Sequence, residues 1–211
     1  LLTIALAYLT VRSQLHQNRL VAIIAAGFLA VGPGFAYIAS YYGTTVFAFF
    51  AALTWWLAQR YVDQQSTTNA LLFSGAALLG GLTRPEGVLL AGFMLLAIIF
   101  FLGWRKSYRV IIAFAIMFAV FGGAYFLWRW SYFGYPLPNP YYKKGQGRLH
   151  LGSLIGSVKY VAFNTFPFAF ALLLALANRQ LAKKAIFLLI PLVGFTAIWV
   201  LMSTEGNLNN R

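Results

Sequence analysis

The sequence has no cysteine and very few acidic residues. Its 211 residues include three Asp or Glu and two His, and 9% of them are charged, against about 25% in ordinary soluble domains. The absence of Cys excludes a disulfide framework and a thiolate metal site. The few carboxylates and imidazoles are too scattered to predict a metal ligand set or a His-based catalytic triad.

Hydrophobic residues are abundant instead and make up 61% of the chain. They fall in a succession of apolar segments, and a membrane-spanning helix needs roughly 20 such residues. We therefore predict an all-α fold, a polytopic transmembrane helical bundle with about eight spans. The predicted spans are residues 1–11, 20–39, 45–59, 70–83, 87–103, 110–128, 161–177 and 185–202.

The positive charge of the chain suggests which side of the membrane each connection faces. A net charge of +13 would indicate nucleic-acid binding in a soluble protein, but short cytoplasmic loops also collect Lys and Arg. The cations that fall on alternate connections are Arg12, Arg19, Arg60, Arg105, Lys106, Arg109, Arg179, Lys183 and Lys184. We expect these loops to face the cytoplasm, with no nucleic-acid partner. The segments 41–45, 83–87, 129–160 and 203–211 then face outward.

We expect one transmembrane domain over residues 1–211, a fragment that lacks N-terminal spans and a C-terminal part. Within it, residues 129–160 are predicted to form an outer-face loop with an interfacial helix. The apolar residues Leu151, Leu154, Ile155 and Val158 have the spacing of an amphipathic helix, which could lie on the bilayer surface. The alternative is that they form the first turns of the next span.

The connection Thr83-Arg84-Pro85-Glu86-Gly87 is a first candidate for chemistry. Thr-x-x-Glu is the pattern of a capping box, in which the two side chains satisfy free amides at a helix start. Arg84 and Glu86 are also charges at a membrane boundary, where ionised groups are candidates for function. A helix N-terminus attracts anions as well, so both a cap and a contact of Arg84 with an anionic ligand are predicted.

The segment from Arg129 to Arg148, RWSYFGYPLPNPYYKKGQGR, is a second candidate. Its alternating prolines force an extended backbone and present Asn139 in a defined orientation. Its aromatic rings are typical of a membrane-interface belt. Lys143, Lys144 and Arg148 could attract anionic lipid head groups or form a phosphate site, in which Lys supplies a point charge and Arg a bidentate fork.

Together these segments resemble a known family. Thr83-Arg84-Pro85-Glu86-Gly87, then Tyr132-Phe133-Gly134, then Leu137-Pro138-Asn139-Pro140-Tyr141-Tyr142-Lys143-Lys144 are similar to motifs of the GT-C superfamily. These are membrane glycosyltransferases that depend on polyprenyl-phosphate sugars. The resemblance is to the group that contains the mycobacterial terminal arabinofuranosyltransferase.

The resemblance implies transfer of a sugar from a polyprenyl-phosphate donor to an extracytoplasmic glycan, lipid or protein acceptor. It implies a multi-pass protein of the bacterial cytoplasmic (inner) membrane whose active site lies on the extracytoplasmic face. Membrane lipids, the donor and the acceptor are its partners, and no cofactor or metal is needed. The residues expected to bind the donor phosphate are Arg84, Lys143, Lys144, Arg129 and Arg148.

The same resemblance implies that other residues shape the substrate site: Asn139, Tyr141, Tyr142 and Tyr132. GT-C enzymes place an essential Asp in their first outer loop, which would precede Leu1, so the base is expected there. Within this sequence Glu86 is the candidate catalytic carboxylate, and it is better suited to orienting Arg84.

Two other classes of protein stay open at this stage. One is a transporter or flippase for an anionic lipid or a lipid-linked sugar. Transporters tend to place polar groups near the bilayer midplane inside broken helices, whereas the charges here collect at one face. The other is a non-catalytic membrane subunit that retains the fold.

Overall fold

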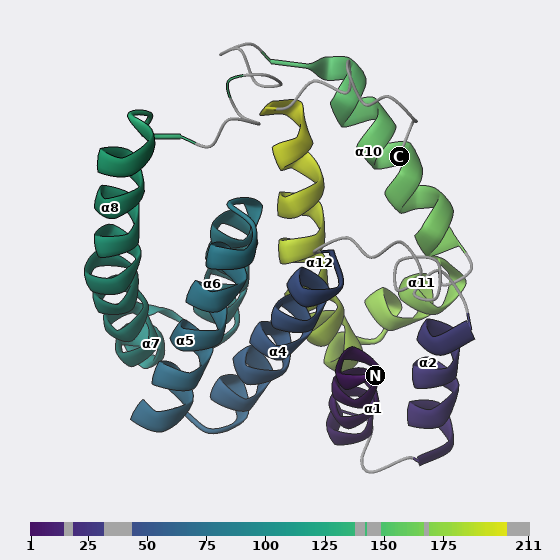
Figure 1. Cartoon of the computed structure of the whole chain (residues 1–211). Helices are drawn as coiled ribbons and strands as arrows, with labels where there is room; N and C mark the ends of the chain where they lie inside the picture. Colours follow the sequence, from purple (N-terminus) through teal and green to yellow (C-terminus); the bar gives the residue numbers. More distant parts are fainter. Residues whose placement is uncertain (15–18, 32–43, 138–141, 143–148, 167–168, 202–211) are drawn as a thin grey trace. The chain divides into compact units, whose positions relative to one another are not determined.

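The computed structural model describes residues 1–14, 19–31, 44–137, 142, 149–166 and 169–201. Within these ranges the fold is all-α and contains no strand, which confirms the all-α part of the predicted fold class (Figure 1). The α-helices are α1 (Leu2–Gln14), α2 (Arg19–Val31), α4 (Thr44–Asp63), α5 (Thr67–Thr83), α6 (Glu86–Leu102), α7 (Trp104–Met117), α8 (Gly123–Phe133), α10 (Leu151–Thr165), α11 (Ala169–Ala177) and α12 (Arg179–Ile198).

Two shorter helical segments complete the described elements. The π-helix η1 (Phe118–Gly122) joins α7 to α8, and the 3₁₀-helix η3 (Trp199–Leu201) follows α12. The result is one continuous helical run of 30 residues, Trp104–Phe133. At a rise of 1.5 Å per residue this run is about 45 Å long, more than the roughly 30 Å of a bilayer hydrocarbon core.

Two helices of the described residues are long and apolar enough to cross a membrane: Trp104–Phe133 and Leu181–Leu201. The first contains the predicted span 110–128, and the second covers residues 185–201 of the predicted span 185–202. The apolar helices Leu2–Ser13, Arg19–Val31 and Glu86–Leu102 are shorter. The structure therefore supports two of the eight predicted spans by length and composition, and the eight-span bundle stays part of the proposal made below.

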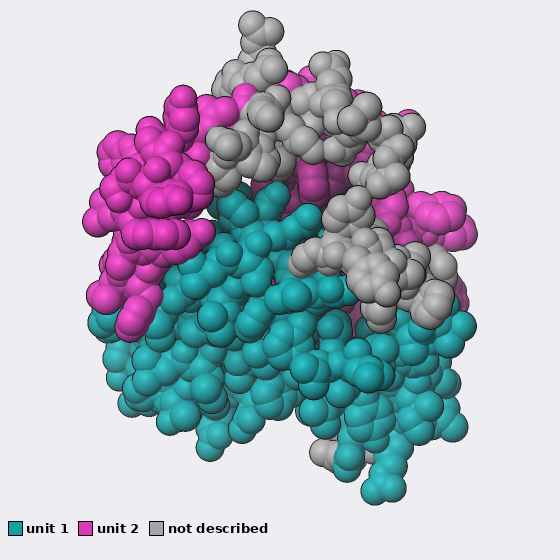
Figure 2. Space-filling view, viewed as in Figure 1, with its two compact units in different colours: residues 1–91, 106–118 teal, residues 92–105, 119–211 magenta. Residues whose placement is uncertain are grey.

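The chain divides into two compact units (Figure 2): unit 1 comprises residues 1–91 and 106–118, and unit 2 comprises residues 92–105 and 119–211. This division concerns packing within the chain, so the prediction of one transmembrane domain over residues 1–211 stays a prediction.

Unit 1 is built on an antiparallel hairpin of α4 and α5, against which α1 packs through α4, with α2 beside α1. The turn between the hairpin helices is set by Ser66, whose hydroxyl accepts a hydrogen bond from the Asn69 amide and caps α5. Small residues lie on the buried face of α5, among them Ala70, Ala76 and Ala77. They allow the neighbouring helices to approach closely.

Aromatic rings fill the interior between α5 and α7. Phe73 is fully buried and its ring lies 6.2 Å from that of Phe114, which stacks on Phe118 at 4.2 Å. Tyr61 is also fully buried and donates a hydrogen bond to the Lys106 carbonyl. These contacts hold α7 to the hairpin.

Unit 2 holds α10 and α11 against α12, and α10 also contacts η3. The ring of Phe101 meets that of Phe187 edge-on at 5.7 Å, and Phe93 occupies the space over Gly194 that a side chain there would need. The His150 amide donates to the Val200 carbonyl at 2.7 Å, which ties the start of α10 to η3.

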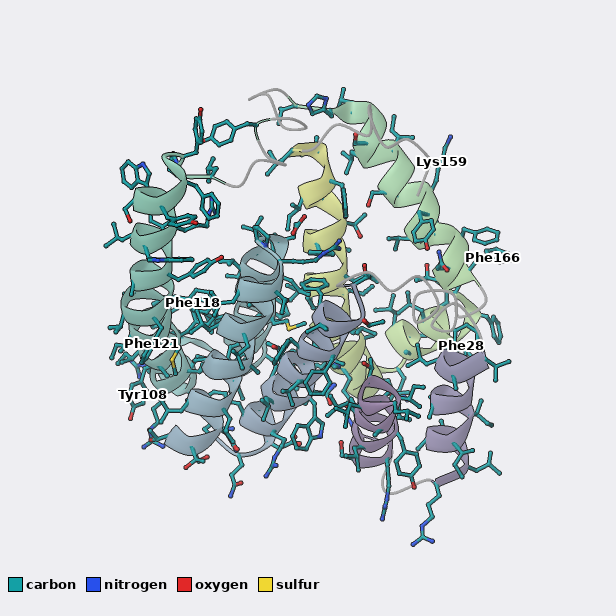
Figure 3. The ribbon with its side chains drawn as sticks, viewed as in Figure 1. Phe28, Tyr108, Phe118, Phe121, Lys159 and Phe166 are labelled. Atoms are coloured by element: carbon teal, nitrogen blue, oxygen red, sulfur yellow. The ribbon has the colours of Figure 1, made fainter. Side chains whose placement is uncertain are left out.

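The helix predicted near residues 151–158 is present as α10, which runs without a break from Leu151 to Thr165. The apolar face of α10 is largely exposed, since Leu151, Ile155 and Val158 are each at least half exposed. Lys159 projects from the helix, and Phe166 follows its last residue (Figure 3). The position of this helix at a bilayer surface stays a prediction.

Candidate functional site

The turn between α5 and α6 holds the first set of candidate residues, all of them in unit 1. Thr83 is the last residue of α5, and its hydroxyl donates to the Gly80 carbonyl at 2.7 Å. The Arg84 amide donates to the same carbonyl at 3.2 Å. The predicted capping box is therefore wrong for Thr83, because its hydroxyl completes the end of α5 and does not cap α6.

Arg84 leaves the helix in an extended conformation, with φ −148° and ψ 132°. Its carbonyl then accepts a hydrogen bond from the Gly87 amide at 2.9 Å, while Pro85 accepts one from the Val88 amide. The backbone of the turn is thus fixed on both sides. Because the Arg84 side chain is exposed, this fixed turn presents a cation at its tip.

Glycines allow the two helices to meet directly beneath this turn. A Cβ atom on Gly87 would lie 2.5 Å from the Gly80 carbonyl oxygen, and one on Gly81 would lie 2.8 Å from a Val88 methyl group. Gly75, on the same helix as Gly80 and Gly81, has open space where a side chain would stand.

The guanidinium of Arg84 lies over the ring of Phe47, 5.9 Å from its centroid. Phe47 belongs to the first turn of α4, and the nearby Phe50 contacts Gly80. The start of α4 and the 83–87 turn therefore meet at one end of unit 1, and the outward side predicted for both stays a prediction. Sequence analysis missed Phe47; its position just after the segment 41–45 was the available signal.

Glu86 is the first residue of α6 and is half-buried. A carboxylate in the first turn of a helix interacts favourably with the helix dipole. This position explains Glu86 without a catalytic role. That Glu86 orients the Arg84 side chain stays a prediction.

The second set of candidate residues lies in unit 2 and begins inside α8. Helix α8 continues to Phe133, so Arg129 and Tyr132 are helical, and the predicted loop starts five residues later than expected. The reason is local: Gly134, with φ +74°, donates its amide to the Trp130 carbonyl and ends the helix there.

Aromatic rings cover the last turns of α8. The ring of Trp128 stacks on that of Tyr132 with centroids 5.8 Å apart, and Tyr132 meets Phe133 edge-on at 4.8 Å. A hollow of about 530 Å³ beside them is lined by Leu127, Trp128, Trp130 and Ser131. Arg129 is half-buried on the same helix.

Tyr142 contacts residues that follow α8. The Tyr142 hydroxyl accepts a hydrogen bond from the Leu137 amide at 3.3 Å, and its ring lies 5.7 Å from that of Tyr135. Tyr142 is thus held against the residues that follow Gly134. The predicted site residues that lie outside the described part of the chain are Asn139, Tyr141, Lys143, Lys144 and Arg148.

The described candidates therefore form two sets, Arg84 and Glu86 in unit 1 and Arg129, Tyr132 and Tyr142 in unit 2. Their assembly into one site stays a prediction. Among the described residues no three His, Asp or Glu side chains come together as a metal-binding group.

No protein-family model, curated protein or solved structure matches this chain.

Proposed function

We propose that this protein is an integral membrane glycosyltransferase of the GT-C type. It would transfer a sugar from a polyprenyl-phosphate donor to an extracytoplasmic acceptor. Under this proposal the chain forms a multi-pass helical bundle in a bacterial inner membrane, including the shorter apolar helices. The resemblance of the Arg-Pro-Glu-Gly turn and the Leu-Pro-Asn-Pro-Tyr-Tyr-Lys-Lys segment suggested this function.

The observation that carries the proposal is the placement of Arg84. Hydrogen bonds fix the Arg84 backbone on both sides, and α5 and α6 meet closely at Gly80 and Gly87 beneath it. The Arg84 guanidinium lies over the ring of Phe47. Departure of a sugar from its phosphate leaves negative charge on the phosphate. A cation held in place before the reaction stabilises this charge without reorganisation of the site.

The dimensions of the α4–α5 hairpin support a place at a membrane interface. Helices α4 and α5 have 20 and 17 residues, or about 30 and 25 Å, close to the thickness of a hydrocarbon core. Arg84 lies at one end of the hairpin. Leucines of α5 such as Leu71, Leu72 and Leu79 are also about half exposed, as leucines on a lipid-facing surface would be.

The rings of α8 would form the sugar or isoprenoid contact. Trp128 and Tyr132 present a stacked aromatic pair, and such faces suit the apolar side of a sugar ring or a prenyl chain. Arg129 would add positive charge beside the rings. Lys143, Lys144 and Arg148 would complete the phosphate-binding set, and Asn139, Tyr141 and Tyr142 would shape the site around the sugar.

In the reaction the acceptor hydroxyl attacks the anomeric carbon, the bond from that carbon to the phosphate oxygen breaks, and polyprenyl phosphate leaves. Arg84 and the lysines would hold the leaving phosphate. A carboxylate base would take the proton of the acceptor hydroxyl. We assign Glu86 to the orientation of Arg84.

The direct test supplies radiolabelled polyprenyl-phosphate sugars to membranes that express the complete gene. Arg84→Gln should lower transfer about 100-fold, because loss of one charge-stabilising group commonly costs 10²–10³ in rate. Arg105→Gln is the matched control, since Arg105 is also an exposed arginine but belongs to a predicted cytoplasmic loop. Equal transfer by the wild type and both variants would contradict the proposed role of Arg84.

The same membranes distinguish the alternative function. A flippase would move a fluorescent lipid-linked sugar across vesicles without forming a glycosylated product. In the described part of the chain most charged residues lie near helix ends. This favours the transferase, because transporters tend to place polar groups at the bilayer midplane.

A further inference from the structure

The end of unit 1 opposite Arg84 carries a second group of fixed cations. Helix α5 begins after Ser66 and ends at Thr83, so about 25 Å of helix separates its two ends. The turn between α4 and α5 lies at the first end, and the start of α7 contacts it there. Arg60, Lys106 and Arg109 belong to this end, which we call the basic end.

Hydrogen bonds hold the backbone of the basic end together. Buried Tyr61 donates to the Lys106 carbonyl at 3.0 Å, and the Arg109 guanidinium donates to the Gln65 carbonyl at 2.9 Å. The side-chain amide of buried Asn69 donates to the Gln64 carbonyl at 2.8 Å. Helix α7 is therefore fastened to the α4–α5 turn, and the cations at its start are fixed relative to Arg60.

Aromatic rings orient the two guanidinium groups. Arg60 lies 4.9 Å above the centroid of the Trp56 ring, and Arg109 lies 5.5 Å from that of the Tyr108 ring and also donates to the Tyr108 hydroxyl at 2.9 Å. Neither ring nor the Gln65 carbonyl carries a negative charge, and the exposed Asp63 at the end of α4 brings one negative charge to this end against the three positive ones. Both arginine side chains, like that of Lys106, are exposed and keep their positive charge at the surface.

This end adjoins the helix that is best suited to cross a membrane. Lys106, Tyr108 and Arg109 lie in the first turns of Trp104–Phe133, and apolar residues follow at once. Figure 3 shows Tyr108 near one end of this run, with Phe118 farther along. A cation at this position lies where phospholipid head groups begin, and an aromatic ring beside it suits the same depth.

We propose that the basic end of unit 1 is a docking surface for anionic phospholipid head groups. Its arginines and lysine would bind the lipid phosphates from the membrane face opposite Arg84. The surface differs from the proposed sugar site because it lies at the other end of α5 and uses none of the candidate site residues. The proposal commits to bilayer lipid because the cations continue directly into an apolar helix.

The test uses the full chain purified in detergent and mixed with equal amounts of phosphatidylglycerol and phosphatidylcholine with identical acyl chains. Native mass spectrometry gives the ratio of the two lipids retained. The wild type should retain phosphatidylglycerol preferentially. Each cation near a charged lipid surface contributes about fivefold in affinity, so Arg60→Gln and Arg109→Gln should each lower the preference about fivefold.

Lys159→Gln is the matched control, because Lys159 is an exposed lysine of unit 2 that lies outside both candidate spans, and its change removes the same charge. Its lipid preference should stay closer to that of the wild type than that of Arg60→Gln. Arg109→Lys, which keeps the charge, should retain most of the preference. A loss with Lys159→Gln as large as that with Arg60→Gln would overturn the proposal, since the effect would then follow total charge.

Two measurements on the wild type remain decisive where a variant fails to fold. The preference should fall several-fold between 0.05 and 0.5 M salt, because surface charges are screened over this range. A preference that does not change with salt would overturn the proposal. Glycerol 3-phosphate in excess should not displace the lipid, and displacement would show a soluble-phosphate site instead.

Discussion

The backbone carbonyl of Gly80 occupies the place that a side chain on Gly87 would need, since a Cβ there would lie 2.5 Å from that oxygen. The same carbonyl accepts hydrogen bonds from the Arg84 amide and the Thr83 hydroxyl. One carbonyl thus fixes both the approach of α5 to α6 and the backbone from which Arg84 projects.

Gly87→Ala should destabilise the protein by about 1–3 kcal/mol, the usual cost of overpacking, because the atom it meets belongs to the backbone and cannot rotate away. Thermal unfolding of the detergent-solubilised chain, followed by intrinsic fluorescence, measures the change. Gly92→Ala is the control on the same helix, where a Cβ meets nothing within 4 Å. A midpoint for Gly87→Ala at or above that of Gly92→Ala would contradict the close contact.

Arg84 and Phe47 should be energetically coupled. A cation at an exposed aromatic ring contributes about 0.5–1 kcal/mol, and the distance of 5.9 Å favours the low end of this range. A double-mutant cycle of Arg84→Gln and Phe47→Leu, read by unfolding, should give a coupling of about 0.5 kcal/mol. The same cycle with Phe49→Leu, whose ring packs on Phe50, should be additive; equal coupling in both cycles would argue against the Phe47 contact.

Tyr61→Phe should cost about 1 kcal/mol, because it removes the hydroxyl that donates to the Lys106 carbonyl from a buried side chain. Hydrogen exchange at the start of α7 should also become faster, since that bond fastens α7 to the α4–α5 turn. Tyr132→Phe is the control: this side chain is 72% exposed and keeps its stacking as Phe. An equal loss of stability in both variants would refute a special role for the Tyr61 hydroxyl.

The run Trp104–Phe133 should place its tryptophans near opposite membrane surfaces. Trp104 and Trp128 are separated by 24 residues of continuous helix, or about 36 Å. In bilayers with brominated lipids, single-Trp variants at these positions should be quenched best by shallow bromines. A Trp placed at exposed Ile116 should be quenched best by deep ones. The same quenching depth at all three positions would contradict a transmembrane orientation.

Several local features followed from the sequence. The apolar segments near 110–128 and 185–202 form helices long enough to cross a membrane, and the periodic apolar residues after His150 form α10. These features depend on composition and on a repeat of 3.6 residues, which a reader of the sequence can see. The boundary at Phe133 was missed because the predicted span ended at residue 128 and the segment from Arg129 was predicted to be a loop, although its first five residues continue the helix.

The sequence by itself determined the all-helical fold and the long apolar helices, because each depends on residues close together in the chain. Only the tertiary structure decided that Arg84 rests on Phe47 and that Tyr61 reaches Lys106. These pairs are 37 and 45 residues apart in the sequence, and their contact depends on how small residues let the helices pack. The turn at Arg84 shows both contributions: the sequence placed a cation between two helices, and the contact of Gly80 with Gly87 fixed the backbone that presents it.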